Sequence, residues 1–277
     1  MMAAALASPT FAQTLRGFVV LAQKTAASKA SYRLAMLFTL LASALGYSVV
    51  LLVWLEVYRE NPEPGPLARD AMLAYLVTAF LVNTVLTLSL EFRFMQRVRM
   101  GLIASDLLRP LGFLAFQMAQ GVGDVLMNIV FALPIAAVGF YFVGGALLPP
   151  SLSCACLGLA SGAIGFLVSF GVTYLVVQAA FVLQSGYGVL FARAALHQVF
   201  SGLAAPLVLF PPALGAVATW LPFRHVIETP VTIWLGQVEA ARVPLLLVEQ
   251  LAWGVLLCGL GHAIFGAVMR RHQIQGG

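Results

Sequence analysis

The sequence predicts an all-α polytopic membrane protein with six transmembrane helices, an N-terminal amphipathic helix in the membrane interface and a broken fifth helix. The chain has 277 residues, of which 61% are hydrophobic and 9% are charged, whereas roughly 25% of the residues of a soluble domain are charged. Its uncharged runs reach the length of about 20 residues that a helix needs to cross a hydrocarbon core. They lack the short alternating pattern of barrel strands, so helices must satisfy the backbone groups in lipid.

A single transmembrane domain is predicted to occupy residues 1–277. Residues 1–33 form a cytosolic tail and the interfacial helix, because apolar residues recur there at three- and four-residue spacings between polar ones. The predicted spans are residues 34–57, 70–90, 112–143, 151–183, 189–219 and 244–269. Spans three and four share one uncharged run, which Leu148-Pro149-Pro150-Ser151 divides because proline cannot continue a helix.

The positive charges predict the orientation. Eleven of the fifteen Lys and Arg residues lie before span one, after span six, or between spans two and three and spans four and five: Arg16, Lys24, Lys29, Arg33, Arg93, Arg97, Arg99, Arg109, Arg193, Arg270 and Arg271. The positive-inside rule makes this side cytoplasmic, together with both termini. The net charge of +5 then reflects topology and attraction to anionic inner-leaflet lipid, and no basic patch with stacking aromatics predicts binding of nucleic acid.

The fifth span is interrupted. Ser201-Gly202 and then Pro206, Pro211 and Pro212 break an uncharged run that ends at Trp220-Leu221-Pro222-Phe223. A broken helix at membrane depth persists only where it is buried in protein or lines a cavity. The spacing leaves two structures open: a proline-kinked helix, or a helix that turns within the outer leaflet and returns.

Four arginines gather between the second and third spans, in EFRFMQRVRMGLIASDLLRPLGF from Glu91 to Phe113. Arginine within hydrocarbon costs several kcal/mol, so this segment is expected at the cytosolic surface. Arg93 and Arg97 lie one turn apart on one face, with apolar residues between them, which is typical of a short amphipathic helix. From the residues alone, the arginines are either a topology signal or a docking surface for another protein.

Two stretches carry a family resemblance. VRMGLIASDLLRPLGF closely resembles the segment of the type-2 ABC exporter permeases, the ABC-2 class, in which a basic residue and a glycine precede a Leu-Leu-Arg-Pro-Leu run. Downstream, FSGLAAPLVLFPPALGAVATWLPFRHVIETPVTIWLG resembles that family's Phe-Ser-Gly, Pro, Phe-Pro, Leu-Pro-Phe and Pro sequence in and after span five. Tyr32-Arg33, Trp54 and Tyr58 also resemble this family, so the resemblance covers nearly the whole chain.

The resemblance implies a permease subunit of an ABC exporter in a bacterial inner membrane, paired with a second copy or a sister permease and with a separate ATPase subunit. The chain contains no G-x-x-x-x-G-K-[ST] loop, so we expect it to bind no cofactor and to be no enzyme by itself, with ATP and Mg²⁺ on the partner. The implied ATPase-coupling residues are Arg93, Arg97, Arg99, Gly101, Asp106, Arg109 and Pro110. The implied gate and broken helix include Ser201, Gly202, Pro206, Pro211, Pro222 and Phe223.

Polar residues inside the predicted spans are few. Asp124, near the inner end of span three, is a candidate for the substrate path or gating, or for capping a helical turn at the wet interface. His197 and His262 have no neighbouring ligand at metal spacing, so packing roles are favoured and no metal site is predicted. Ser161 in GLASGAIG has no paired base and fits close helix packing.

The predicted cargo is amphiphilic or lipidic, because the spans carry few charges and many aliphatic and aromatic faces. A secondary transporter is an alternative, although neither an inverted repeat nor ion-coupling charges at the midplane are visible. A non-catalytic membrane assembly subunit also stays open, since it would need no ATPase.

Overall fold

The structure is a computed structural model that describes residues 11–62, 65–100, 112–183 and 187–275. Within these ranges the chain forms helices and connections and no strand, so the predicted all-α class is confirmed for the part described. The α-helices are α1 (Phe11–Ser31), α2 (Arg33–Glu60), α3 (Arg69–Leu86), α4 (Leu90–Arg99), α6 (Phe113–Val143), α7 (Leu152–Leu183), α8 (Tyr187–Phe200), α9 (Pro212–Trp220), α10 (Glu228–Trp234) and α11 (Val243–Gln275). Short 3-10 helices lie in the connections: η1 (Gly144–Leu147), η2 (Leu207–Leu209), η3 (Pro222–His225) and η4 (Ala240–Arg242).

Five segments of the described chain are helical, long and apolar enough to cross a membrane. They are Leu34–Glu60, Arg69–Arg97, Phe113–Leu147, Leu152–Gln178 and Ala240–Arg270. These segments coincide with predicted spans one, two, three, four and six. The predicted fifth span is not among them. The described part of the chain therefore contains five such segments, and the predicted count of six spans is not confirmed.

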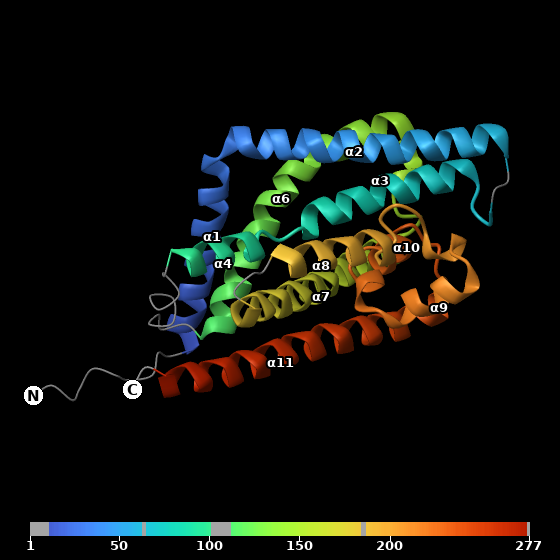
Figure 1. Cartoon of the computed structure of the whole chain (residues 1–277). Coiled ribbons are helices and arrows are strands. Elements are labelled where there is room, and N and C mark those ends of the chain that lie inside the picture. Colours follow the sequence, from blue (N-terminus) through green and yellow to red (C-terminus); the bar gives the residue numbers. More distant parts are fainter. Residues whose placement is uncertain (1–10, 63–64, 101–111, 184–186, 276–277) are drawn as a thin grey trace, which may run out of the picture.

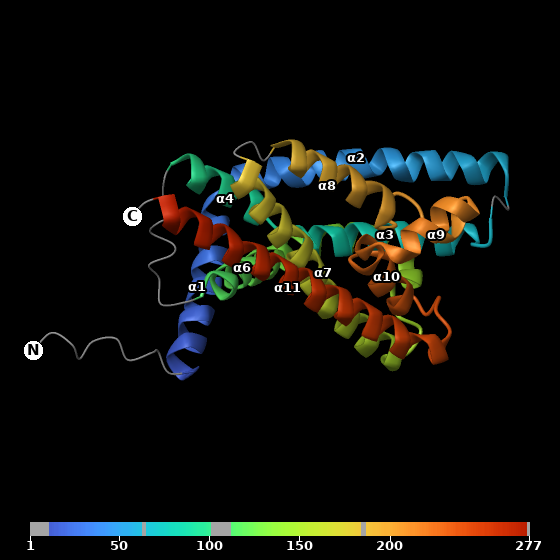
Figure 2. The same cartoon turned by 60° about the horizontal axis from the view of Figure 1, so that its bottom comes forward.

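The long helices α2, α3, α7 and α11 run broadly along one direction, whereas α1 stands across one end of the bundle (Figure 1). That end also carries α4 and the last turns of α11, and the α2–α3 connection, α9 and α10 lie at the opposite end (Figures 1 and 2). Helix α1 packs closely on α6 at Gly123, where an added Cβ would lie 2.5 Å from the Ala22 carbonyl oxygen. Leu15 and Val19 of its apolar stripe are 53% and 45% exposed.

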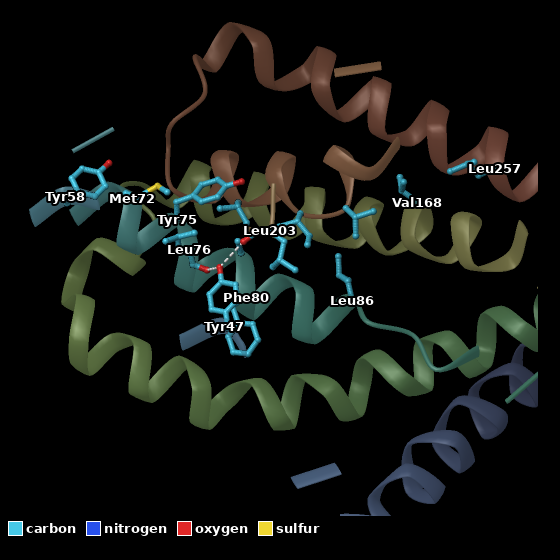
Figure 3. Packing of buried hydrophobic residues seen from close by; sticks show 14 residues of the cluster. Tyr47, Tyr58, Met72, Tyr75, Leu76, Phe80, Leu86, Val168, Leu203 and Leu257 are labelled. Atoms are coloured by element: carbon cyan, nitrogen blue, oxygen red, sulfur yellow. Dashed lines mark hydrogen bonds between the residues drawn. The ribbon is translucent and has the colours of Figure 1, made fainter. Parts of the chain in front are cut away.

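The main buried cluster lies where α2, α3 and α7 meet the segment that follows α8. Tyr47 of α2 stacks on Phe80 of α3 with ring centroids 4.4 Å apart, and Figure 3 draws both rings beside Leu203. Tyr75 and Leu76 of α3 are fully buried in the same cluster. The core therefore fixes the C-terminal half of α2, together with α3, against the broken fifth segment.

Residues 189–219, the predicted fifth span, are interrupted as expected and do not form one continuous helix. Helix α8 has 14 residues and is therefore about 21 Å long, shorter than a hydrocarbon core of roughly 30 Å. After it the chain turns at Gly202, whose φ is +83°, and the backbone N–H of Glu228 donates to the Ser201 carbonyl at 3.0 Å. Residues 201–228, here called the return segment, thus leave α8 and come back to it. This backbone course is that of the second structure left open, and its place in the outer leaflet stays a prediction.

The predicted second span, 70–90, is also interrupted. Helix α3 ends at Leu86 and α4 begins at Leu90, so residues 87–89 form a non-helical linker, which no proline or glycine announces. The linker exists because side chains from other helices bind its backbone groups.

Candidate functional site

Asp124 of α6 and Arg93 of α4 form the centre of a buried charged site. The Asp124 side chain is 0% exposed. Arg93 Nη1 donates to Asp124 Oδ1 and Nη2 donates to Oδ2, each at 2.8 Å. Two parallel charge-assisted bonds fix direction as well as distance, so α4 is held in one orientation on α6.

The same carboxylate binds two further groups. The backbone N–H of Ser89 donates to Asp124 Oδ2 at 2.9 Å, and Lys29 Nζ of α1 lies 3.6 Å from Oδ1. Lys29 Nζ also donates to Asn128 Oδ1 of α6 at 2.7 Å. Burial lowers the pKa of the Lys29 ammonium, and the neighbouring Asp124 carboxylate opposes that shift. One buried carboxylate thereby joins α1, the linker, α4 and α6.

The linker between α3 and α4 is satisfied by side chains. Asn128 Nδ2 donates to the carbonyl oxygens of Val85 at 3.1 Å and Thr87 at 2.8 Å. Ser169 Oγ of α7 donates to the Leu86 carbonyl at 3.0 Å. Unpaired backbone groups are costly at membrane depth, and non-helical backbone is tolerated there only when the protein supplies partners. Because these partners bind the backbone between the two helices, α3 and α4 are separate helices and not one continuous rod.

A second ion pair holds α4 from another side. Glu91 is 3% exposed in its side chain, and its Oε1 lies 2.8 Å from Arg193 Nε of α8. Arg193 Nη2 also donates to Glu91 Oε2 at 3.2 Å. Positions two apart on a helix point about 200° away from each other, so Glu91 and Arg93 bind opposite sides of α4. The helix is fixed between α6 and α8.

Tyrosine and tryptophan side chains of α2 and α3 donate hydrogen bonds to the return segment. The hydroxyl of Tyr75 donates to the Gly202 carbonyl at 2.9 Å. The Tyr47 hydroxyl shares its one proton between the nearer Leu76 carbonyl and the Leu203 carbonyl, which lies at 3.2 Å. Trp54 Nε1 donates to the Ala204 carbonyl at 3.0 Å. Figure 3 shows Tyr47 reaching Leu203. Three consecutive carbonyls beyond α8 therefore have partners without a helix.

The predicted gate residues all fall in the return segment. Ser201 and Gly202 form the turn after α8, and Pro206 precedes η2. Pro211 precedes α9, while Pro222 and Phe223 begin η3. Glu228 closes the segment, because its Oε1 also accepts the Leu207 backbone N–H at 3.0 Å. A gating role for these residues stays a prediction.

The predicted coupling residues are only partly described. Arg93 meets Asp124 within the subunit, Arg97 is half-buried on α4, and Arg99 ends that helix. Gly101, Asp106, Arg109 and Pro110 lie outside the described residues. Lys29, Glu91 and Arg193 were not predicted as parts of the site, and Asn128 was visible in the sequence only as a polar residue within a span. Glu91 and Asp124 carried a usable signal, since acidic residues are rare on the predicted basic side.

Other polar residues pair inside the bundle. His197 Nε2 lies 3.2 Å from Asn83 Oδ1, and Ser161 Oγ donates to Gln250 Oε1 at 3.0 Å. Gly158, beside Ser161, packs against Trp234 of the same chain. Among the described residues no group of three or more His, Cys, Asp and Glu could hold a metal ion.

The fold and the site define a polytopic helical membrane protein with two buried ion pairs that hold α4 at one end of the bundle. The sequence profile of the ABC-2 family transporter proteins matches residues 29–276. The chain belongs to this family and is thus a multi-pass ABC transporter permease, a membrane transport component that is not itself catalytic. No curated protein matches the chain.

Proposed function

We propose that this chain is the permease subunit of an ATP-driven exporter that carries an amphiphilic or lipidic substrate with a separate ATPase subunit. The ATPase binds and hydrolyses ATP with Mg²⁺, and its movement reaches the permease through α4. The observation that carries this proposal is that two ion pairs, Arg93–Asp124 and Glu91–Arg193, hold α4 on opposite sides. A short helix bound firmly to two different parts of the bundle passes on any force applied to it.

Docking of the ATPase on α4 fits the positive charges of the last turn of this helix. Arg97 and Arg99 follow the clamped part of α4, and acidic and polar groups of the ATPase meet them. Arg93 has a different task, because Asp124 occupies its guanidinium. It positions α4 so that the docked ATPase cannot rotate the helix without moving α6.

The cargo class is supported by an apolar groove of about 720 Å³ between α3, α6, α7 and α10. Its lining is mainly aliphatic and aromatic and includes Leu81, Val85, Leu126, Ile129, Phe140 and Leu159. A groove of this kind accommodates acyl chains through the hydrophobic effect and offers little to a hydrated ion. Alternating conformations, driven by the ATPase, then expose it to each side.

The membrane arrangement follows from the same features. Helix α1 lies in the inner interface with Leu15 and Val19 toward lipid. The basic end of the bundle, with both termini, faces the cytoplasm of a bacterial inner membrane. Helix α2 is peripheral and exposes Phe38, Leu45 and Val49, so it meets lipid or the second permease of a dimer.

The proposal is tested with inverted membrane vesicles from cells that produce this chain together with the ATPase encoded nearest to it. The probe is an NBD-labelled phospholipid added to the outer surface, which is the cytoplasmic leaflet. Export moves the probe inward, so ATP should raise the fraction protected from dithionite. Vesicles with an ATPase lacking its P-loop lysine are the matched control. ATP-driven uptake of carboxyfluorescein in place of the lipid would refute the cargo class, and no ATP-driven uptake of either probe would refute the export function.

A further inference from the structure

The Glu91–Arg193 pair joins the two regions to which the proposed function gives separate tasks. Glu91 belongs to α4, on which the ATPase is proposed to dock, and Arg193 belongs to α8, which leads into the return segment. The Glu91 carboxylate is 3% exposed, with its Oε1 2.8 Å from Arg193 Nε. Water has little access to this carboxylate, so the pair is not weakened by solvent as a surface pair would be.

Helix α8 connects that pair rigidly to the return segment. Arg193 and Ser201 are about 12 Å apart along the helix axis at 1.5 Å per residue. The Ser201 backbone N–H still donates to the His197 carbonyl at 3.1 Å, which continues the helical pattern into the turn. The His197 ring also packs edge-on against Phe223 of η3, with centroids 6.4 Å apart. A displacement of Arg193 therefore reaches both ends of the return segment.

The connection between α3 and α4 is not a continuous helix, unlike the path from Arg193 to Ser201. Residues 87–89 between α3 and α4 are non-helical, so α4 can move without carrying α3 as one rod. The Arg93–Asp124 pair joins α4 to α6 on the opposite side and does not reach the return segment. Of the two ion pairs, only the one with Arg193 lies on a continuous helix to Ser201.

We propose that the Glu91–Arg193 pair transmits movement of α4 to α8 and thereby opens the return segment. Glu91 and Arg193 are positioning residues for transport: they touch each other, and the return segment is what they move. The inference rests on the proposed function, in which a docked ATPase moves α4. It predicts that separating the two charges leaves the ATPase bound and active while the far end of the permease stops responding to nucleotide.

The experiment uses a cysteine reporter in the complex of permease and ATPase reconstituted in nanodiscs. Cys154, Cys156 and Cys258 are replaced by alanine, and Ser201→Cys supplies a thiol at a position that is 0% exposed. The rate of maleimide labelling is compared without nucleotide and with Mg²⁺, ATP and vanadate. Val208→Cys is the matched control, because Val208 is 62% exposed and should label equally fast in both states.

In the parental complex we expect nucleotide to raise labelling of Ser201→Cys by about tenfold, the size of a modest shift between two populated states. Arg193→Gln should keep the bound ATPase but lose this rise, and Glu91→Gln should lose it too. The swapped pair Glu91→Arg with Arg193→Glu restores the attraction between α4 and α8 and should recover at least half of the rise, whereas a role of either side chain outside this pair would not be rescued.

Two results would overturn the inference. One is a full nucleotide response in folded Arg193→Gln or Glu91→Gln, and the other is a folded swapped pair without any response. The swapped pair decides the matter if the single variants do not fold, as judged by size-exclusion chromatography. Failure of the proposed function is distinct, because the parental permease would then fail to retain an ATPase at all.

Discussion

Arg93 and Asp124 face each other through two parallel N–H···O bonds of 2.8 Å, and the carboxylate that receives them is fully buried. The same carboxylate accepts the backbone N–H of Ser89, immediately before α4 begins. Asp124 thus acts as an N-terminal cap supplied by a different helix. Both the start of α4 and its rotation depend on this one residue of α6.

Asp124→Asn should therefore destabilise the permease strongly. Removing one partner of a buried ion pair leaves the other charge unpaired and costs about 3 to 5 kcal/mol. The measurement is the melting temperature of the purified permease in mild detergent. Asp70→Asn is the matched control, since Asp70 is exposed in the first turn of α3. Equal melting temperatures for Asp124→Asn and the parent would contradict the assigned role.

Tyr75→Phe should destabilise the return segment while preserving the packing of the ring. The change leaves the buried Gly202 carbonyl without its donor, and an unsatisfied buried group costs about 1 to 3 kcal/mol. Thermal unfolding measures the loss. Tyr141→Phe serves for comparison, because Tyr141 is 83% exposed and should be neutral. If both variants unfolded at the parental temperature, the aromatic donors would have no structural role.

Gly123→Ala should disturb the contact between α1 and α6. The new Cβ would lie 2.5 Å from the Ala22 carbonyl oxygen, and overpacking of this kind costs typically about 1 to 3 kcal/mol. Gly162→Ala is the matched change, since nothing lies within 4 Å of its added Cβ and alanine favours a helix by up to about 1 kcal/mol. We expect a lower melting temperature for the first variant and an equal or higher one for the second. The reverse order would refute the close packing of α1 on α6.

Arg97→Glu combined with Arg99→Glu should weaken association with the ATPase and leave membrane insertion intact. The reason is that two attractive charges become repulsive toward an acidic docking surface. Co-purification from membranes measures association, and the amount of permease in the membrane fraction measures insertion. Arg69→Glu, on an exposed residue that begins α3, should not change either. Undiminished association of the double variant would remove the docking role.

The sequence predicted the long helices well because their signal is local. Each apolar run that became α2, α6, α7 or α11 needs no partner to satisfy its backbone in lipid. The break after α8 was also predicted locally, from Gly202 and the prolines that follow it, whereas the break between α3 and α4 depends on distant residues. Nothing within residues 87–89 announces a linker, and it forms because Asn128 and Asp124 of α6 bind its backbone. The length of an uncharged run cannot reveal such partners.

For the functional residues, the sequence predicted the type of charge but not the pairing partners. The arginine cluster indicated a basic surface, yet the residues did not reveal that Arg93 turns inward to Asp124. Pairing across helices depends on how α4 and α6 pack, and two charges 31 positions apart have no periodic relationship. Glu91 and Arg193, from α4 and α8, escaped the sequence analysis for the same reason.

If this permease works with a separate ATPase docked on α4, the two proteins should purify together. We would produce the chain with the ATPase encoded nearest to it and purify the chain through a tag in mild detergent. We expect a stoichiometric ATPase in the eluate that hydrolyses ATP. A folded permease that elutes without any ATPase would contradict this expectation and favour a secondary transporter or a membrane assembly subunit.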